Sequence, residues 1–211
     1  MARRWWSRPE VIPAIVGPSA LEVPMTDPAG REPAMHADEQ LAAHARELID
    51  GNRYMTLGTA DADGNPWVTP VFYATADYAS FYWVSQTDAV HSRNLAGRPQ
   101  LSIVIFDSTV PADTGRAVYM TATAQELTGS DLDLGVEVYP GPAVRGGSAV
   151  AREEVRPPEP YRLYRAAVSA CSVLCPREPG QPCPLHGIAA DHRTGISLAH
   201  LAVQDAHARH D

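Results

Sequence analysis

Three cysteines and a histidine near the C-terminus are the side chains best suited to metal chemistry. Cys171, Cys175, Cys183 and His186 follow the spacing C-x3-C-x7-C-x2-H. Three thiols and an imidazole make a legitimate tetrahedral zinc set, and a C-x2-H pair has the spacing of zinc ligands. His192 is a possible fourth ligand if one cysteine is left out. A structural zinc site is therefore one interpretation of this segment.

The spacing of the first two cysteines argues against that site. If Cys171 and Cys175 lie in one strand, their side chains point the same way roughly 13 Å apart, because a strand rises about 3.3 Å per residue. That distance is too great for one metal unless the strand ends between them, and Pro176 indicates an end just after Cys175. We therefore expect unligated loop thiols and no metal, with Cys175, Cys183 and His186 kept as the zinc alternative.

The hydrophobic period defines the elements that must position these side chains. Leu41, Ala45 and Leu48 recur at helical spacing, and Gly51 is a natural helix stop. From Tyr54 onward the period changes to two, which is the strand period. Strands are predicted over residues 54–60, 66–74, 80–85, 101–106, 117–127 and 161–174, and helices over 40–50, 89–96 and 196–210.

The predicted elements make one mainly β domain of the α+β class. Turn residues at 61–65 indicate that neighbouring strands pair as antiparallel hairpins. A small, partly open barrel with flanking helices accounts for this pattern, and we place it in residues 37–211. Residues 1–36 hold six prolines and no apolar period, which predicts a disordered arm. Within the domain, 129–160 is predicted to be an irregular insertion and 175–195 a loop containing Cys and Pro.

The charge balance excludes several classes of partner. Acidic residues number 25 against 17 basic residues, a formal net charge of −8, which does not suit a nucleic-acid backbone or an anionic membrane. No stretch approaches the roughly 20 apolar residues of a membrane helix. Arg3 and Arg4 are reminiscent of an export signal, but Pro13 and Pro18 interrupt the apolar region that it requires. Three cysteines in one segment do not form a secreted disulfide framework, so we expect a soluble, cytoplasmic protein.

An ordered set of short motifs lies between residues 53 and 127. The segment begins RYMTLGTADADGNPWVTPVFY, continues with SFYWVSQTDAVHSRNLAGRPQLSIVIFD, and ends with RAVYMTATAQEL. It contains a strand ending in Leu-Gly-Thr, an Asp-Gly hairpin, a Pro-x-x-Thr-x-Val strand, a His-x-Arg-Asn-Leu helix and a long Gly-Arg-Ala strand, in that order. No single motif is specific, but the ordered set resembles the pyridoxamine 5'-phosphate oxidase-like flavoproteins.

That resemblance implies a six-stranded antiparallel split β-barrel with flanking helices. It also implies a homodimer that binds FMN in grooves at the subunit interface, and an oxidoreductase acting on a small molecule. The implied cofactor-binding residues are Thr69, Pro70, Val71, Ser85, Gln86, Thr87, His91, Ser92 and Gln125, the last from the partner subunit. FMN itself accepts a hydride or electrons, so no catalytic triad or carboxylate pair is expected.

One departure from the family pattern concerns the phosphate of FMN. Relatives commonly place an arginine and a lysine at the helix start, where this chain has Ala89 and His91, with Arg93 two residues further on. A phosphate bound by a histidine and hydroxyl groups is held more weakly and more pH-dependently than one between Arg and Lys. The alternative is that His91 is a surface histidine and that Thr69 and Gln125 are ordinary polar strand residues.

The substrate and the cofactor leave further alternatives open. The family often returns its C-terminal segment to the flavin, which implies substrate contacts for His192 and Arg193, although Asp191 and Arg193 would also suit a surface ion pair. The deazaflavin cofactor F420 is a second cofactor, but the shortage of lysine argues against its polyanionic tail. A non-catalytic flavin- or haem-binding protein is the other alternative, with His91 or His192 as haem ligand. Pyridoxamine phosphate oxidation itself is not expected, because a second basic cluster is missing.

Overall fold

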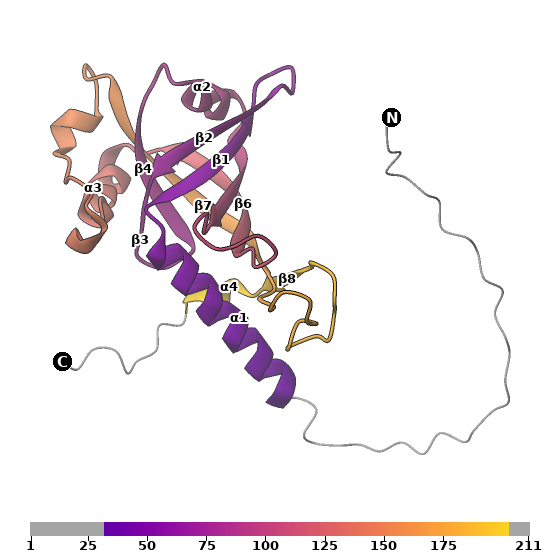
Figure 1. The fold of residues 1–211 in the computed structure, drawn as a ribbon. Helices are drawn as coiled ribbons and strands as arrows, with labels where there is room; N and C mark the ends of the chain where they lie inside the picture. The colour runs from indigo at the N-terminus through magenta and orange to yellow at the C-terminus, as the bar shows by residue number, and fades with distance from the viewer. Residues whose placement is uncertain (1–31, 203–211) are drawn as a thin grey trace, which may run out of the picture.

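The computed structural model describes residues 32–202, so residues 1–31 and 203–211 lie outside the described part (Figure 1). Most of the predicted arm and the end of the predicted C-terminal helix fall outside it. The elements are α1 (Glu32–Gly51), β1 (Tyr54–Ala60), β2 (Pro66–Phe72), β3 (Ala74–Thr75), β4 (Ser80–Gln86), α2 (Val90–Gly97), β5 (Gln100–Phe106), β6 (Ala117–Glu126), α3 (Gly129–Val138), the 3-10 turns η2 (Ala143–Arg145) and η3 (Arg152–Val155), β7 (Tyr161–Leu174), β8 (Arg193–Ile196) and α4 (Leu198–Ala202). Within this described part, no helix has the length and apolar character to cross a membrane.

The strands form one curled antiparallel sheet (Figure 1). Its order is β2-β1-β5-β6-β7-β4-β3, with β8 paired to β7 beside this path. The two outermost strands in this order, β2 and β3, are consecutive in the chain and are joined by Tyr73 alone. The sheet therefore curls until its first and last strands come together. Among residues 32–202, strand β2 nevertheless pairs only with β1, and the barrel stays split along the free side of β2. This confirms the predicted antiparallel split barrel.

The number of strands differs from the prediction. Six strands were expected, and the structure adds the two-residue β3 and the four-residue β8. Neither is long enough to show a hydrophobic alternation, and β8 exists because it pairs with the end of β7, a contact distant in sequence. The first helix begins at Glu32 rather than Gln40.

Alternating residues of the strands fill the barrel. Burial alternates along β1, β4 and β5, as the period of two predicted. The core includes Met55, Leu57, Phe81, Trp83, Ile103, Ile105 and Val118, all at 0% exposure. Each side chain of this kind stabilises the fold by about 1.5–3 kcal/mol when it is fully buried. Helix α1 adds its apolar face to the same cluster and packs against β5, β6, β8 and α4.

The segment 129–160, expected to be irregular, contains α3, η2 and η3 and forms a second small core. Leu127, Leu132, Val155 and Leu163 are buried together there. Helix α3 approaches β7 closely because it has Gly135 at the contact. A Cβ at this position would lie 2.6 Å from Leu127 Cδ1 and 2.8 Å from Leu163 Cδ2. The segment is therefore a packed cover on β7.

A buried polar contact fixes helix α2 against the barrel. The Asn94 amide donates to Thr59 Oγ1 at 3.1 Å, and the Thr59 hydroxyl donates to the Trp67 carbonyl at 3.4 Å. Asn94 and Thr59 are both buried. Because a buried polar group left without a partner costs about 1–3 kcal/mol, this contact specifies where α2 sits. The position of α2 in turn decides which side chains meet at its first turn.

Candidate cofactor-binding site

A groove of about 250 Å³ lies between α2, β6 and the first half of β7. The residues that line it are Thr87, Ser92, Arg93, Leu95, Ala96, Ala124, Gln125, Glu126 and Tyr164. Three of the predicted cofactor-binding residues, Thr87, Ser92 and Gln125, therefore come together from three separate segments. The fold, and not proximity in sequence, brings Gln125 to the other two within one chain, whereas the family resemblance implied that Gln125 reaches the cofactor from the partner subunit.

The start of α2 gives one end of this groove a character that suits an anion. The N-cap residue Ala89 has no side chain to cap the helix, and the first turn from Val90 contains no acidic residue. The first N–H groups of a helix lack partners within it and, with the helix dipole, favour negative charge. Thr87 supplies an exposed hydroxyl here, and Arg93 an exposed guanidinium that donates to the Asp88 carbonyl.

Ser85 and His91 are not among the residues that line the groove. Both side chains are buried, and His91 Nε2 lies 2.8 Å from Ser85 Oγ. Burial lowers the pKa of His91 below its ordinary value of 6.5, so the imidazole is neutral at pH 7. The positive charge at this helix start comes from Arg93 instead. Gln86, the other predicted residue of this turn, is exposed, and its amide donates to the Tyr161 hydroxyl at 3.2 Å.

The opposite wall of the groove carries Gln125 and Glu126 from β6. The Gln125 amide donates to Asp131 Oδ2 at 3.4 Å. Glu126 forms an ion pair with Arg162 at 3.1 Å, and the Arg162 side chain is only 12% exposed. Arg162 compensates the charge of the Glu126 carboxylate. The guanidinium of Arg93 therefore gives the groove a net positive charge.

Tyr164 lines the groove from its buried side and is a site residue that the sequence did not single out. Its ring stacks on Trp83 of β4 with centroids 5.5 Å apart and planes inclined by 16°. Burial raises the pKa of Tyr164 above 10, so the phenol stays protonated. The alternation of β7 marks Tyr164 as facing inward. Its place beside α2 depends on how β4, β6 and β7 are ordered in the sheet.

Strand β2 presents the remaining predicted residues at the free edge of the sheet. Thr69 pairs with the buried Leu57, and its own Oγ1 is buried with no hydrogen-bond partner among the described residues. Val71 is buried and Pro70 is exposed. A buried hydroxyl without a partner is uncommon and suits a polar ligand atom. Helix α2 contacts both β2 and β6, so it links this edge to the groove.

Comparison with known protein families shows which family the chain belongs to. The sequence profile described as pyridoxamine 5'-phosphate oxidase matches residues 41–175, more than half of the chain, from within α1 to the end of β7. The chain belongs to the pyridoxamine 5'-phosphate oxidase family. No curated protein matches the sequence.

Solved structures share the fold of this pyridoxamine 5'-phosphate oxidase family member at low identity. A haem-binding protein from Mycobacterium smegmatis aligns with a TM-score of 0.56 and 19% identity, over 77% of this chain and 60% of that protein. Campylobacter jejuni ChuZ aligns with a TM-score of 0.52 and 12% identity, over 64% and 55%. A Clostridium acetobutylicum protein related to general stress protein 26 gives 0.50 and 11%, over 75% and 96%. The chain thus spans less than two thirds of the first two proteins, and the likeness concerns the fold alone.

The two predicted substrate residues of this family member lie far from the groove in the same chain. Arg193 pairs with the last residue of β7, whereas Tyr164 stands near its beginning. Roughly 30 Å of strand separates the two positions. The Arg193 guanidinium lies 3.7 Å from the centre of the Tyr119 ring, and His192 Nε2 lies 3.2 Å from His186 Nδ1. Within one chain, His192 and Arg193 therefore do not reach a ligand in the groove.

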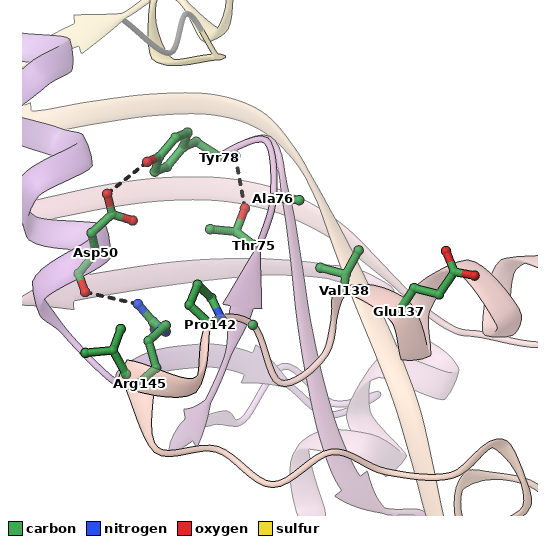
Figure 2. Close-up of a pocket in the computed structure, with 10 residues that line it drawn as sticks. Asp50, Thr75, Ala76, Tyr78, Glu137, Val138, Pro142 and Arg145 are labelled. Carbon is green, nitrogen blue, oxygen red and sulfur yellow. Dashed lines mark hydrogen bonds between the residues drawn. The ribbon is translucent and has the colours of Figure 1, made fainter. Parts of the chain in front are cut away.

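A larger pocket of about 630 Å³ lies between the end of α1, β3 and α3 (Figure 2). Figure 2 shows Arg145 donating to the Asp50 carbonyl, and the Tyr78 hydroxyl donating to the Asp50 carboxylate at 2.9 Å. The same guanidinium donates to the carbonyls of Ile49 (3.2 Å), Asn52 (2.8 Å) and Tyr73 (3.2 Å). Arg145 is the one basic residue among those lining this pocket, and it is used to cap α1. None of the predicted cofactor residues lines the pocket, so the groove beside α2 is the candidate site.

Proposed function

We propose that the chain binds FMN in the groove beside α2 and acts as an FMN-dependent oxidoreductase on a small molecule. The observation that carries this proposal is the meeting of three phosphate-binding features. These are the uncapped start of α2, the hydroxyls of Thr87 and Ser92, and the guanidinium of Arg93. A phosphate ester suits such a set. Membership of the pyridoxamine 5'-phosphate oxidase family supports a flavin as the molecule that carries the phosphate.

The remaining predicted residues suit the rest of the cofactor. A groove of about 250 Å³ accommodates part of an FMN molecule. The unpartnered Thr69 hydroxyl and the free edge of β2 are the polar groups suited to the ring. When bound, FMN supplies the redox chemistry by accepting and releasing a hydride or electrons. The residues of the chain bind and orient: Arg93 compensates the phosphate charge, and Gln125 offers an amide to the cofactor.

We propose a homodimer as the form that completes the site. Three large apolar side chains are exposed on the outer face of β2, β1 and β5: Val68 at 63%, Tyr54 at 61% and Phe106 at 50%. Large exposed apolar side chains on one face of neighbouring strands are typical of an interaction surface. A second copy over this face would also cover the free edge of β2. In that arrangement, Arg193 supplies a substrate contact to the groove of the other subunit, whereas His192 Nε2 faces His186 in its own chain.

A non-catalytic haem-binding role is the second candidate. The observation that favours it is the sparse positive charge of the groove, where Arg93 is the one basic residue in the lining. The solved structure from M. smegmatis with the same fold is a haem-binding protein, which supports this candidate. Against it, His91 is buried and bonded to Ser85, so an axial bond to iron requires that contact to break. F420 is less suited, because its polyanionic tail calls for more basic residues than this groove has.

Absorption spectra of the purified full-length chain, with and without added FMN or haem, test these alternatives. We expect a flavin spectrum that follows the protein through gel filtration. Arg93→Met should weaken FMN affinity about 10- to 100-fold, because a hydrogen bond from a charged donor contributes about 1.5–3 kcal/mol. Arg98→Met is the matched control, since Arg98 ends the same helix outside the groove and donates to the Ala62 carbonyl.

The other outcomes separate the alternatives. A Soret band with added haem and no retained flavin would favour the haem-binding role. Bound FMN that neither NADH nor NADPH reduces would indicate a flavin carrier and count against the oxidoreductase. FMN that stays free in solution at every concentration would refute the assignment of the groove to FMN.

A further inference from the structure

The connection between β7 and β8 is long and has no helix or strand of its own. It covers residues 175–192 and is the orange-to-yellow loop below the barrel in Figure 1. Compact domains rarely contain loops of more than about 12–15 residues without a special reason for their order. The base of the loop is closed by the Cys175 N–H, which donates to the His192 carbonyl at 3.0 Å. Arg177 pairs with Asp191 at 2.6 Å, so Asp191 does not form the ion pair with Arg193 that the sequence left open.

Four side chains of metal-binding type converge inside this loop. Cys175, Cys183, His186 and His192 each offer one ligand atom, and these four atoms lie within 4.8 Å of one another. The sulfur atoms of Cys175 and Cys183 are each 3.6 Å from His186 Nδ1. His192 Nε2 is 3.2 Å from the same nitrogen. Both cysteines are buried, at 4% and 1% exposure.

These separations match the edges of a tetrahedron around zinc. With Zn–S bonds of about 2.3 Å and Zn–N bonds of about 2.05 Å, tetrahedral angles give S···N edges of about 3.6 Å and an N···N edge of about 3.3 Å. The two S···N distances and the N···N distance in this loop agree with those values to about 0.1 Å. We propose that Cys175, Cys183, His186 and His192 bind one Zn²⁺ ion as a structural site.

The groups around the four ligands hold them in the orientation that a metal requires. His192 Nδ1 donates to the Ala190 carbonyl at 3.1 Å, which leaves Nε2 free to face the cluster. Thr194 Oγ1 lies 3.0 Å from the Cys175 sulfur. Metal-bound histidines usually donate their second N–H in this way, and thiolates accept such outer hydrogen bonds. The C-x2-H turn is closed by the Gly187 N–H, which donates to the Cys183 carbonyl at 2.8 Å, with Gly187 at φ +67°.

The sequence disfavoured a metal because Cys171 and Cys175 are too far apart in one strand. That reasoning correctly removes Cys171, which lies within β7 and outside the cluster. It does not remove the site, because β7 ends at Leu174 and His192 takes the fourth position. On binding, the two thiols lose their protons, and the ion joins the end of β7 to the start of β8. His192 is then unavailable to substrate or haem, and only Arg193 remains for such a contact.

Metal analysis of the full-length chain tests the site independently of any flavin. We expect one zinc ion per chain after expression with added zinc. Cys183→Ala and His186→Ala should lower zinc affinity at least about 100-fold, because even the loss of an outer-shell partner costs about 10–100-fold. Thr194→Val, which removes only the outer hydroxyl, should cost about 10-fold. Cys171→Ala is the matched control and should keep the ion.

A second measurement covers variants that fail to fold. Co²⁺ added to the reduced, metal-free wild-type chain should give the intense visible bands of tetrahedral cobalt and a thiolate charge-transfer band, with one equivalent at saturation. Added Zn²⁺ should abolish both. Octahedral cobalt spectra, or zinc that persists in both ligand variants and is lost with Cys171→Ala, would overturn the proposal.

Discussion

His91 of α2 and Ser85 of β4 are both buried, with His91 Nε2 2.8 Å from Ser85 Oγ, and burial lowers the pKa of His91. From the sequence, a histidine at a helix start is a reasonable cation for a phosphate. In the structure its burial favours the neutral imidazole, because a charged group loses hydration when it is removed from water. Arg93, two residues further along the helix, is exposed and presents its guanidinium at the groove. Burial therefore indicates a structural role for His91, whereas exposure makes Arg93 the candidate phosphate ligand.

The lowered pKa of His91 predicts how stability depends on pH. In the unfolded chain a histidine titrates at about 6.5, so below that pH the unfolded state binds more protons than the folded state and the free energy of unfolding falls. His44, whose pKa burial also lowers, acts in the same direction. Urea unfolding between pH 7.5 and 5.5 should show this loss, and it should be smaller in His91→Gln. Equal pH slopes for the two proteins would contradict the buried, neutral assignment.

At the scale of elements, the segment after β6 stabilises a helix distant in sequence. Arg145 of η2 donates to carbonyls at the C-terminal end of α1 and lies over the Tyr73 ring, with its guanidinium carbon 4.6 Å from the ring centre. The last carbonyls of a helix have no partner within it, and a guanidinium satisfies several of them at once. The segment 129–160 is thus part of the fold, because it caps α1 and covers β7.

Replacing this arginine tests the link between the two elements. Arg145→Met should lower the free energy of unfolding by about 2–3 kcal/mol, because hydrogen bonds from a charged donor contribute about 1.5–3 kcal/mol and are not additive. Arg156→Met removes a surface ion pair with Glu153 and should cost less than about 1 kcal/mol. Urea denaturation of both variants checks the difference. Similar losses in the two would show that Arg145 is not a cap of α1.

At the scale of the whole molecule, the split of the barrel leaves one face and one edge to be covered. The apolar outer face formed by Tyr54, Val68 and Phe106 reaches the free edge of β2. On the inner side of the same strand, Thr69 has a buried hydroxyl without a hydrogen-bond partner among the described residues. In the homodimer that we propose, each subunit therefore supplies only part of the FMN site. This is the physical reason to expect oligomerisation and cofactor binding to be linked, since a second copy covers the face and the edge together.

The dimer proposal predicts the effect of a charge on this face. Val68→Asp should convert a dimer to a monomer in gel filtration with light scattering, and should weaken FMN binding with it, because a buried unpaired carboxylate is strongly unfavourable. Val144→Asp is the matched control, since Val144 is 84% exposed on η2, outside this face. A monomeric wild-type chain, or a Val68→Asp dimer of unchanged affinity, would count against the proposal.

The sequence by itself determined the elements and the family. The change to a period of two at Tyr54 and the order of short motifs up to Leu127 specify the strands of the split barrel, because side-chain alternation is a local property of the chain. The family resemblance that these motifs carry implied Thr87, Ser92 and Gln125 as cofactor-binding residues. Short strands such as β3 and β8 carry too few residues to show a period, so they were missed.

The tertiary structure decided which of these residues meet. Tyr164 enters the groove because β7 pairs with both β4 and β6 beside α2, and Arg145 reaches α1 across the insertion. Cys175 and His192 are 17 positions apart, yet their ligand atoms share one cluster because β8 returns along the end of β7. Such contacts depend on strand order and on loop paths, which the local pattern of residues does not encode.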